Sequence, residues 1–141
     1  MRQELRDSRR SFLAGILLLS LAGCGGPTTP VREEIEKISP AEHYGGSVKN
    51  MLYELKAKVR KRGVAAAKKE IPLVLENLQG YEQQPIGEHL ETMKKIEQIL
   101  KDTEKKLAGQ MSKEEAVSAA DTVADLGAKL PGKANENPRV E

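Results

Sequence analysis

Apolar residues recur three and four positions apart along most of the C-terminal two thirds of the chain. This spacing places them on one side of a helix and leaves the charged residues on the other side. Glycine and proline interrupt the pattern, so we predict four helical segments, at residues 47–62, 64–78, 87–107 and 113–130. Similar lengths and short connections favour antiparallel neighbours. The pattern therefore predicts an all-α fold, an antiparallel up-down four-helix bundle over residues 46–131.

Each segment carries an apolar stripe that it can bury only against the other segments. The stripes comprise Val48, Met51, Leu52, Leu55 and Val59; Val64, Ala67, Ile71, Val74, Leu75 and Leu78; Leu90, Met93, Ile96, Leu100 and Leu107; and Ala116, Ala119, Ala120, Val123, Leu126, Gly127 and Leu130.

Local signals mark the ends of these helices. We expect Ser47 to be the N-cap of the first helix and Gly63 to end it in a left-handed conformation. Pro72 falls inside the second stripe without changing its phase, so a kinked but continuous helix is predicted there. Ser112 and Glu115 have the spacing of a capping box, which predicts the start of the last helix.

Residues outside the bundle lack this periodicity. Gly, Pro and Thr make up residues 25–30 and are typical of a linker. Helical turns are expected at 31–38, and Ser39-Pro40 resembles the start of a short segment that ends at Gly45-Gly46. Residues 24–45 are therefore predicted to be a flexible tether with short helical turns. The polar composition of residues 132–141 predicts a disordered tail.

The N-terminus combines a basic stretch, Met1 to Arg10, with an apolar run from Phe12 to Leu21. A run of about 10 residues is too short to span a bilayer, which needs roughly 20. This order is typical of a signal peptide, and we expect residues 1–23 to be cleaved off. The alternative is an ordinary buried helix.

The run ends at Leu21, Ala22, Gly23 and Cys24. These residues resemble the lipobox of bacterial lipoproteins. The resemblance implies that a signal peptidase cleaves before Cys24, and that this cysteine carries a diacylglycerol group and a further acyl chain such as palmitate. It also implies a location in the cell envelope, lipid-anchored to the periplasmic or outer face of a membrane. The alternative is a lone buried cysteine.

A second resemblance lies inside the signal peptide. Arg9 and Arg10, followed by Phe12 and Leu13, resemble the twin-arginine export motif S-R-R-x-F-L-K, with Ala14 where lysine is common. The resemblance implies recognition by the export machinery that moves folded proteins. The alternative is a chance arginine pair that uses the general secretory route.

Charge and composition narrow the function classes. The chain has 23 basic and 21 acidic residues, of which four arginines and two acids lie in residues 1–23. The remaining chain is formally neutral and offers no electrostatic reason to bind nucleic acid. The single cysteine excludes an intrachain disulfide.

Candidate chemistry is sparse. His43 and His89 are the only histidines, and the simplest interpretation is that both are solvated or packed in loops. The alternative is that His89 and Met51, or Met93, ligate a metal or a b-type haem inside the bundle. The chain has neither a C-x-x-C-H nor a Glu-x-x-His motif. A basic run at residues 56–62 suggests either a solvated helix face or a patch for anionic lipid.

The sequence therefore predicts a protein that is not an enzyme and needs no cofactor. Its expected role is that of a membrane-anchored envelope lipoprotein, whose helical module binds or scaffolds an envelope protein partner. The alternative function is a small b-type haem or metal-binding electron-transfer bundle that is exported folded.

Overall fold

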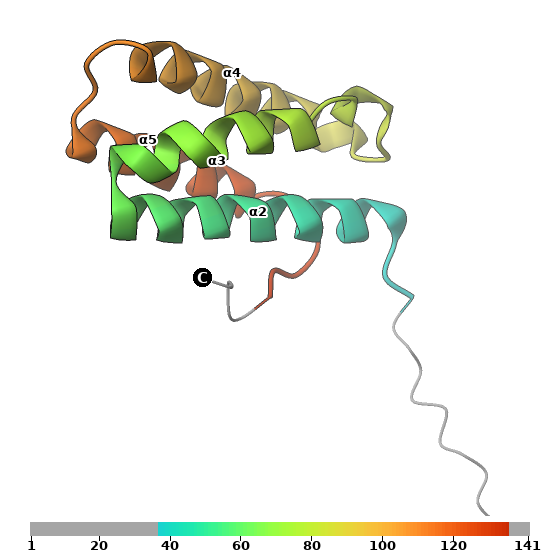
Figure 1. Cartoon of the computed structure of the whole chain (residues 1–141). Helices are drawn as coiled ribbons and strands as arrows, with labels where there is room; N and C mark the ends of the chain where they lie inside the picture. Colours follow the sequence, from blue (N-terminus) through green and yellow to red (C-terminus); the bar gives the residue numbers. More distant parts are fainter. Residues whose placement is uncertain (1–36, 136–141) are drawn as a thin grey trace, which may run out of the picture. The chain divides into compact units, whose positions relative to one another are not determined.

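Four α-helices account for most of the computed structural model, which describes residues 37–135 (Figure 1). They are α2 (Pro40–Arg62), α3 (Val64–Asn77), α4 (Leu90–Leu107) and α5 (Lys113–Gly127). Two short 3₁₀ helices, η1 (Tyr81–Gln83) and η2 (Gly87–His89), connect α3 to α4. Residues 37–135 contain no strand and no helix long and apolar enough to cross a membrane. The signal peptide, the twin-arginine motif and the lipobox lie outside the described residues.

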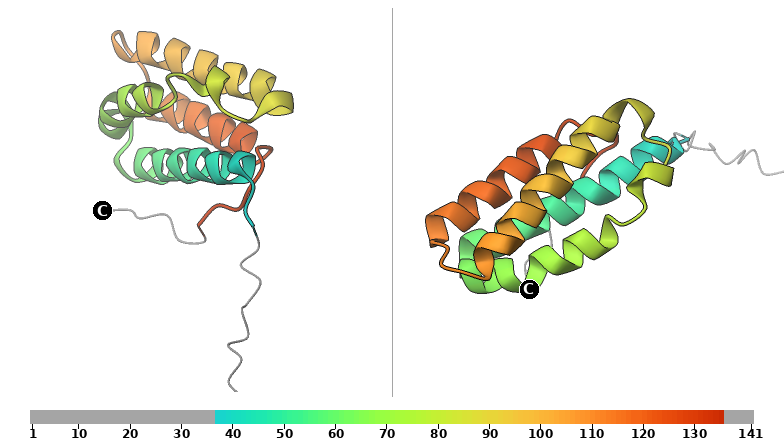
Figure 2. Two further views of the ribbon diagram at one scale, coloured as in Figure 1. Left: turned by 90° about the vertical axis from the view of Figure 1, so that its right-hand side faces the viewer. Right: turned by 90° about the horizontal axis from the view of Figure 1, so that it is seen from above.

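The helices form a bundle. α2 contacts α3 and α5, and α4 also contacts α3 and α5, so α2 and α4 lie on opposite corners (Figure 2). In this bundle α3 and α5 also contact each other. The prediction of an all-helical four-helix bundle is confirmed for the part of the chain that the structure describes. Its finer statement, that the helices run up and down in antiparallel order, stays a prediction.

The core consists of the predicted stripes. The largest side chains with almost no exposed surface are Val48, Leu52, Leu55, Val59, Ile71, Leu78, Met93, Ile96, Leu100 and Val123. All four helices contribute to this set. The helix α3 continues through Pro72, as predicted, and buries Ile71 and Val74 on either side of it. Ala119 and Leu126 were predicted to face inward and are only half-buried.

The start of the first helix differs from the prediction. α2 begins at Pro40, and Ser39 is its N-cap, with Glu42 completing a capping box. The Ser39 Oγ accepts from the Glu42 backbone N–H at 3.2 Å, and the Glu42 carboxylate accepts from the Ser39 N–H at 2.8 Å. The predicted tether therefore ends at Ser39, not at residue 45. The prediction that Ser47 caps this helix is wrong.

Gly45 and Gly46 do not break α2, because both lie under the C-terminal segment of the domain. A Cβ atom on Gly45 would collide with the backbone oxygen of Pro131, and one on Gly46 would lie 2.7 Å from that of Lys133. Only a helix surface without side chains admits a second backbone this closely. Two glycines that resemble a helix end in the sequence are thus a contact surface in the fold.

Hydrogen bonds fix this C-terminal segment, residues 131–135, along the first half of α2. The Lys49 Nζ donates to the Gly132 backbone oxygen at 2.5 Å, and the Asn135 N–H donates to the Asn50 Oδ1 at 2.6 Å. The prediction of a disordered tail is therefore wrong for residues 132–135. Residues 136–141 lie outside the described residues.

The turn between α2 and α3 lies where it was predicted, but its conformation differs. Gly63 ends α2 with a φ of 65°, which suits glycine, yet its ψ of −143° is not that of the predicted left-handed cap. Its N–H donates to the Val59 oxygen at 2.7 Å. The capping box of Ser112 and Glu115 is also present at the start of α5. This helix ends at Gly127, and Leu130 is buried in the turn that follows.

We predict that Gly45→Ala destabilises the fold. The added methyl group overlaps the Pro131 oxygen, and overpacking of this kind costs about 1–3 kcal/mol, partly offset by the better helix propensity of alanine. Trypsin cleavage after Lys133 should become faster as the C-terminal segment separates from α2. Gly87→Ala is the control, because its Cβ would meet nothing within 4 Å. Equal unfolding free energies for the two variants would contradict the contact.

Candidate functional site

The four residues that the sequence offered as possible ligands differ in burial and in their place in the fold. His43 is exposed on the first turns of α2, and His89 precedes α4, where its Nε2 lies 3.3 Å from the Glu88 carboxylate. Met93 is fully buried in the apolar core, and Met51 is half-buried against that core from α2. Met51 therefore lies on a helix that does not pack directly on α4 or η2, which carry Met93 and His89.

Polar groups elsewhere in the described domain are already engaged. Between residues 37 and 135, no group of three or more His, Cys, Asp or Glu side chains could hold a metal ion. Within the same range, every buried side-chain nitrogen or oxygen has a hydrogen-bond partner.

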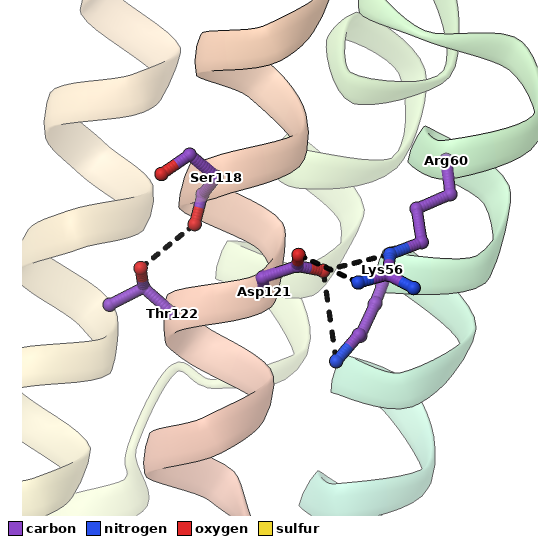
Figure 3. Close-up of polar contacts among 5 residues, drawn as sticks. All are labelled: Lys56, Arg60, Ser118, Asp121 and Thr122. Carbon is purple, nitrogen blue, oxygen red and sulfur yellow. Dashed lines mark hydrogen bonds and ion pairs between the residues drawn. The ribbon is translucent and has the colours of Figure 1, made fainter.

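The basic run on α2 is partly neutralised by acids on the neighbouring helices. The Arg60 guanidinium donates to both Asp121 oxygens on α5, at 3.0 and 2.8 Å, and the Lys56 Nζ lies 3.7 Å from the same carboxylate (Figure 3). The hydrogen bond from Arg60 holds the pKa of Asp121 below its usual value. Lys58 pairs with Glu70 on α3 at 3.0 Å. These three cations therefore join helices, and the predicted lipid patch at residues 56–62 does not exist as one open surface.

A second polar contact lies at the loop between α3 and α4. Tyr81 is the first residue of η1 and is buried, with 5% of its surface exposed. Its hydroxyl donates to the Glu97 Oε2 at 2.9 Å, and the Lys101 Nζ lies 2.5 Å from the Glu97 Oε1. Burial raises the pKa of Tyr81 to about 12, with the Glu97 carboxylate adding to the shift. Hydrogen bonding from Lys101 lowers the pKa of Glu97. This arrangement fixes the loop on α4.

The groove lies between α4 and the start of α5, with a volume of about 540 Å³. Its apolar lining comes from Ile99, Met111 and Ala119, and its polar lining from Asp102, Thr103, Lys106, Glu114, Glu115 and Ser118. Two of these polar residues already make hydrogen bonds within the chain. The Thr103 hydroxyl donates to the Ile99 oxygen at 2.6 Å, and the Glu115 carboxylate belongs to the capping box. An open groove of this kind can accommodate part of a partner's surface.

Sequence analysis missed the groove and the contacts of Tyr81 and Asp121. Asp121 stands 61 positions from Arg60 in the chain, so periodicity along one helix could not connect them. The only signal was the position of Asp121 on the predicted last helix, on a side not assigned to the core.

We predict that Tyr81→Phe lowers the free energy of unfolding by about 1 kcal/mol at neutral pH, since a buried hydrogen bond is lost. The tyrosine also makes stability depend on alkaline pH. The unfolded chain releases this proton near pH 10 and the folded chain near 12, so stability should fall as pH rises through that window.

Chemical unfolding at pH 7 and across pH 10–12 measures both effects, and the alkaline slope should be smaller in Tyr81→Phe. The control at neutral pH is Tyr53→Phe, because the Tyr53 hydroxyl makes no hydrogen bond within residues 37–135. A loss at Tyr53 equal to that at Tyr81 would refute a specific role for the bond to Glu97.

Comparison with known proteins gives no relative. No protein-family model matches the chain, and neither a curated protein nor a solved structure matches it. The assignment of a function therefore rests on the chain's own residues.

Proposed function

We propose that this protein is a membrane-anchored lipoprotein of the bacterial cell envelope, whose helical bundle acts by binding or scaffolding and not by catalysis. The observation that carries the proposal is the apolar run from Phe12 to Leu21 that ends at Cys24. The only cysteine of the chain stands at the position where the lipobox resemblance requires it.

The physics of lipid anchoring favours more than one acyl chain. Each buried methylene contributes about 0.8 kcal/mol, and one chain alone gives weak, reversible binding. A diacylglycerol thioether with a further amide-linked chain on Cys24 would give stable attachment. The membrane is then the first partner of the protein, and signal peptidase and the export machinery are transient ones.

The described bundle supports a binding role. Several of its polar side chains connect one helix to another or cap helix ends, as Arg60, Lys58 and Ser112 do. The groove between α4 and α5 is open and lined by both apolar and charged groups. A surface of this kind suits reversible contact with another envelope protein.

The twin-arginine resemblance fits such a domain. The bundle is built from local contacts and short connections, a topology that typically folds fast. A protein that folds before it leaves the cytoplasm needs a route for folded cargo, and Arg9 and Arg10 would provide the recognition signal.

The first test concerns the anchor. We expect Cys24→Ser to abolish metabolic labelling with a radioactive fatty acid and to move the protein out of the detergent phase on phase separation. The reason is that serine offers no thiol for the thioether bond. Ser20→Cys with Cys24→Ser is a control that restores a thiol outside the lipobox position and should not restore labelling. Unchanged detergent partitioning of Cys24→Ser would refute the lipid assignment.

The second test concerns the export route. Replacing Arg9 and Arg10 together by lysine keeps the charge and removes the two guanidinium groups that the receptor reads. We expect precursor to accumulate in the cytoplasm, as seen by fractionation and by the larger size of the uncleaved chain. Replacing Arg2 and Arg6 by lysine should leave processing unchanged. Normal processing of the Arg9, Arg10 variant would assign the chain to the general secretory route.

A further inference from the structure

Four exposed lysines gather at one end of the bundle, where two connections of the chain meet. This basic end is formed by Lys61, Lys105, Lys106 and Lys113. Lys61 lies in the last turn of α2, and Lys105 and Lys106 lie in the last turn of α4. The α2–α3 turn and the α4–α5 loop lie at the same end of the bundle in both figures (Figures 1 and 2).

Contacts across this end show that the two connections touch. A Cβ atom on Gly63 would lie 3.3 Å from the Lys113 Cγ, so the stem of this lysine covers the α2–α3 turn. Lys106 lines the groove beside Glu114 and Glu115, and it helps to lower the pKa of Glu115. The lysines of three helices thus form one surface, although they are up to 52 positions apart in the chain.

The charges of this surface are not cancelled by ion pairs. In the described part of the chain, none of its four lysines has an acidic partner within 4.0 Å, whereas Lys56, Lys58 and Arg60 further along α2 all do. The acids nearby are Asp102, Glu104, Glu114 and Glu115. Asp102 accepts from the Gln98 side chain and Glu115 accepts the Ser112 N–H, so neither neutralises a lysine through an ion pair. The four lysines therefore stay free to contact an anion outside the chain.

Helix dipoles account for only part of this pattern. Lysines in the last turns of α2 and α4 stabilise the negative ends of those helices. Lys113, however, is the first residue of α5, where the positive end of the dipole disfavours a cation. Its stem packs on the α2–α3 turn at Gly63, and this contact leaves its charge at the basic end.

We propose that the basic end docks on the headgroups of an anionic phospholipid membrane and so orients the bundle. Exposed lysines distributed over three helices fit a surface of many negative charges better than they fit one small anion, which needs a concave site with converging donors. The inference rests on the proposed function, because a lipid anchor at Cys24 keeps the domain beside such a surface.

The length of the chain allows this docking. The tether joins the bundle at Ser39, at the opposite end of α2 from Lys61. The helix has 23 residues and is about 35 Å long. The 15 residues from 25 to 39 can span at most about 50 Å. The bundle can therefore turn its basic end to the membrane that holds the anchor.

The experiment attaches the mature protein, residues 24–141, to vesicles through the Cys24 thiol and a maleimide-bearing lipid. This chemistry replaces the natural anchor, so the test does not depend on lipidation in the cell. Lysine acetylation by a neutral reagent is then measured residue by residue with mass spectrometry. One set of vesicles is phosphatidylcholine alone, and the other contains about a third phosphatidylglycerol.

We expect anionic vesicles to slow acetylation of Lys106 by about fivefold or more relative to neutral ones, with Lys95 and Lys129 changing little. High salt should remove the protection. The variant Lys61→Gln, Lys105→Gln, Lys113→Gln should lose the protection of Lys106. The matched variant Lys37→Gln, Lys95→Gln, Lys129→Gln changes the net charge equally and should keep it. All six lysines are exposed, so the substitutions should leave the core intact.

Several outcomes would overturn the proposal. One is equal acetylation of Lys106 on neutral and anionic vesicles. Another is the same loss of protection in both triple variants, which would reflect net charge alone. The same test on neutral vesicles separates two other ligands. If 10 mM inorganic phosphate protects Lys106 at constant ionic strength, the lysines form a discrete anion site. If a duplex oligonucleotide protects Lys106, they form a nucleic-acid surface. Failure of fatty-acid labelling in the cell would refute the natural anchor and leave this result unaffected.

Discussion

Shared burial of apolar stripes is the interaction on which the rest of this structure depends. Every helix has a charged outer side, and a helix of 14 to 23 residues with half its surface apolar is marginal alone in water. Leu52, Ile71, Leu100 and Val123, one from each helix, have at most 2% of their surface exposed. Removing any one helix would return the stripes of two others to water. The stability of the fold, the arrangement of its surface charges and the groove therefore exist only in the assembled bundle.

Periodicity predicted most of this fold because burial acts on single side chains at fixed spacing. The all-helical class, the core positions of α3 and α4 and the capping box at Ser112 all follow from local rules. The prediction that a helical segment ends at Gly45 and Gly46 was wrong, because a tertiary contact keeps both glycines inside α2. Two successive glycines usually end a helix, but here their lack of side chains admits the backbone at Pro131. No local pattern reveals a partner more than 80 positions away.

The surface was less predictable than the core for a similar reason. A basic run along α2 looks uniform in the sequence, yet Asp121 and Glu70 divide it into paired cations and the exposed Lys61. Conversely, Gly63 and Lys113 become neighbours only when the connections of the bundle meet. The charge of a helical protein's surface is decided by which helix lies alongside which, and this information is absent from any one segment.

The segment at residues 131–135 also determines how the domain responds to mechanical load. Any pull on the chain before Ser39 enters the bundle at the first turn of α2 and would peel that helix away one turn at a time. The backbone of residues 131–133 lies across Gly45 and Gly46, and the Lys49 and Asn50 side chains bond to the residues beside it. Peeling must therefore break contacts with the opposite terminus before it reaches the large core residues. Residues 131–135 therefore hold the first turns of α2 in place, and these contacts resist force at the point where it enters the domain.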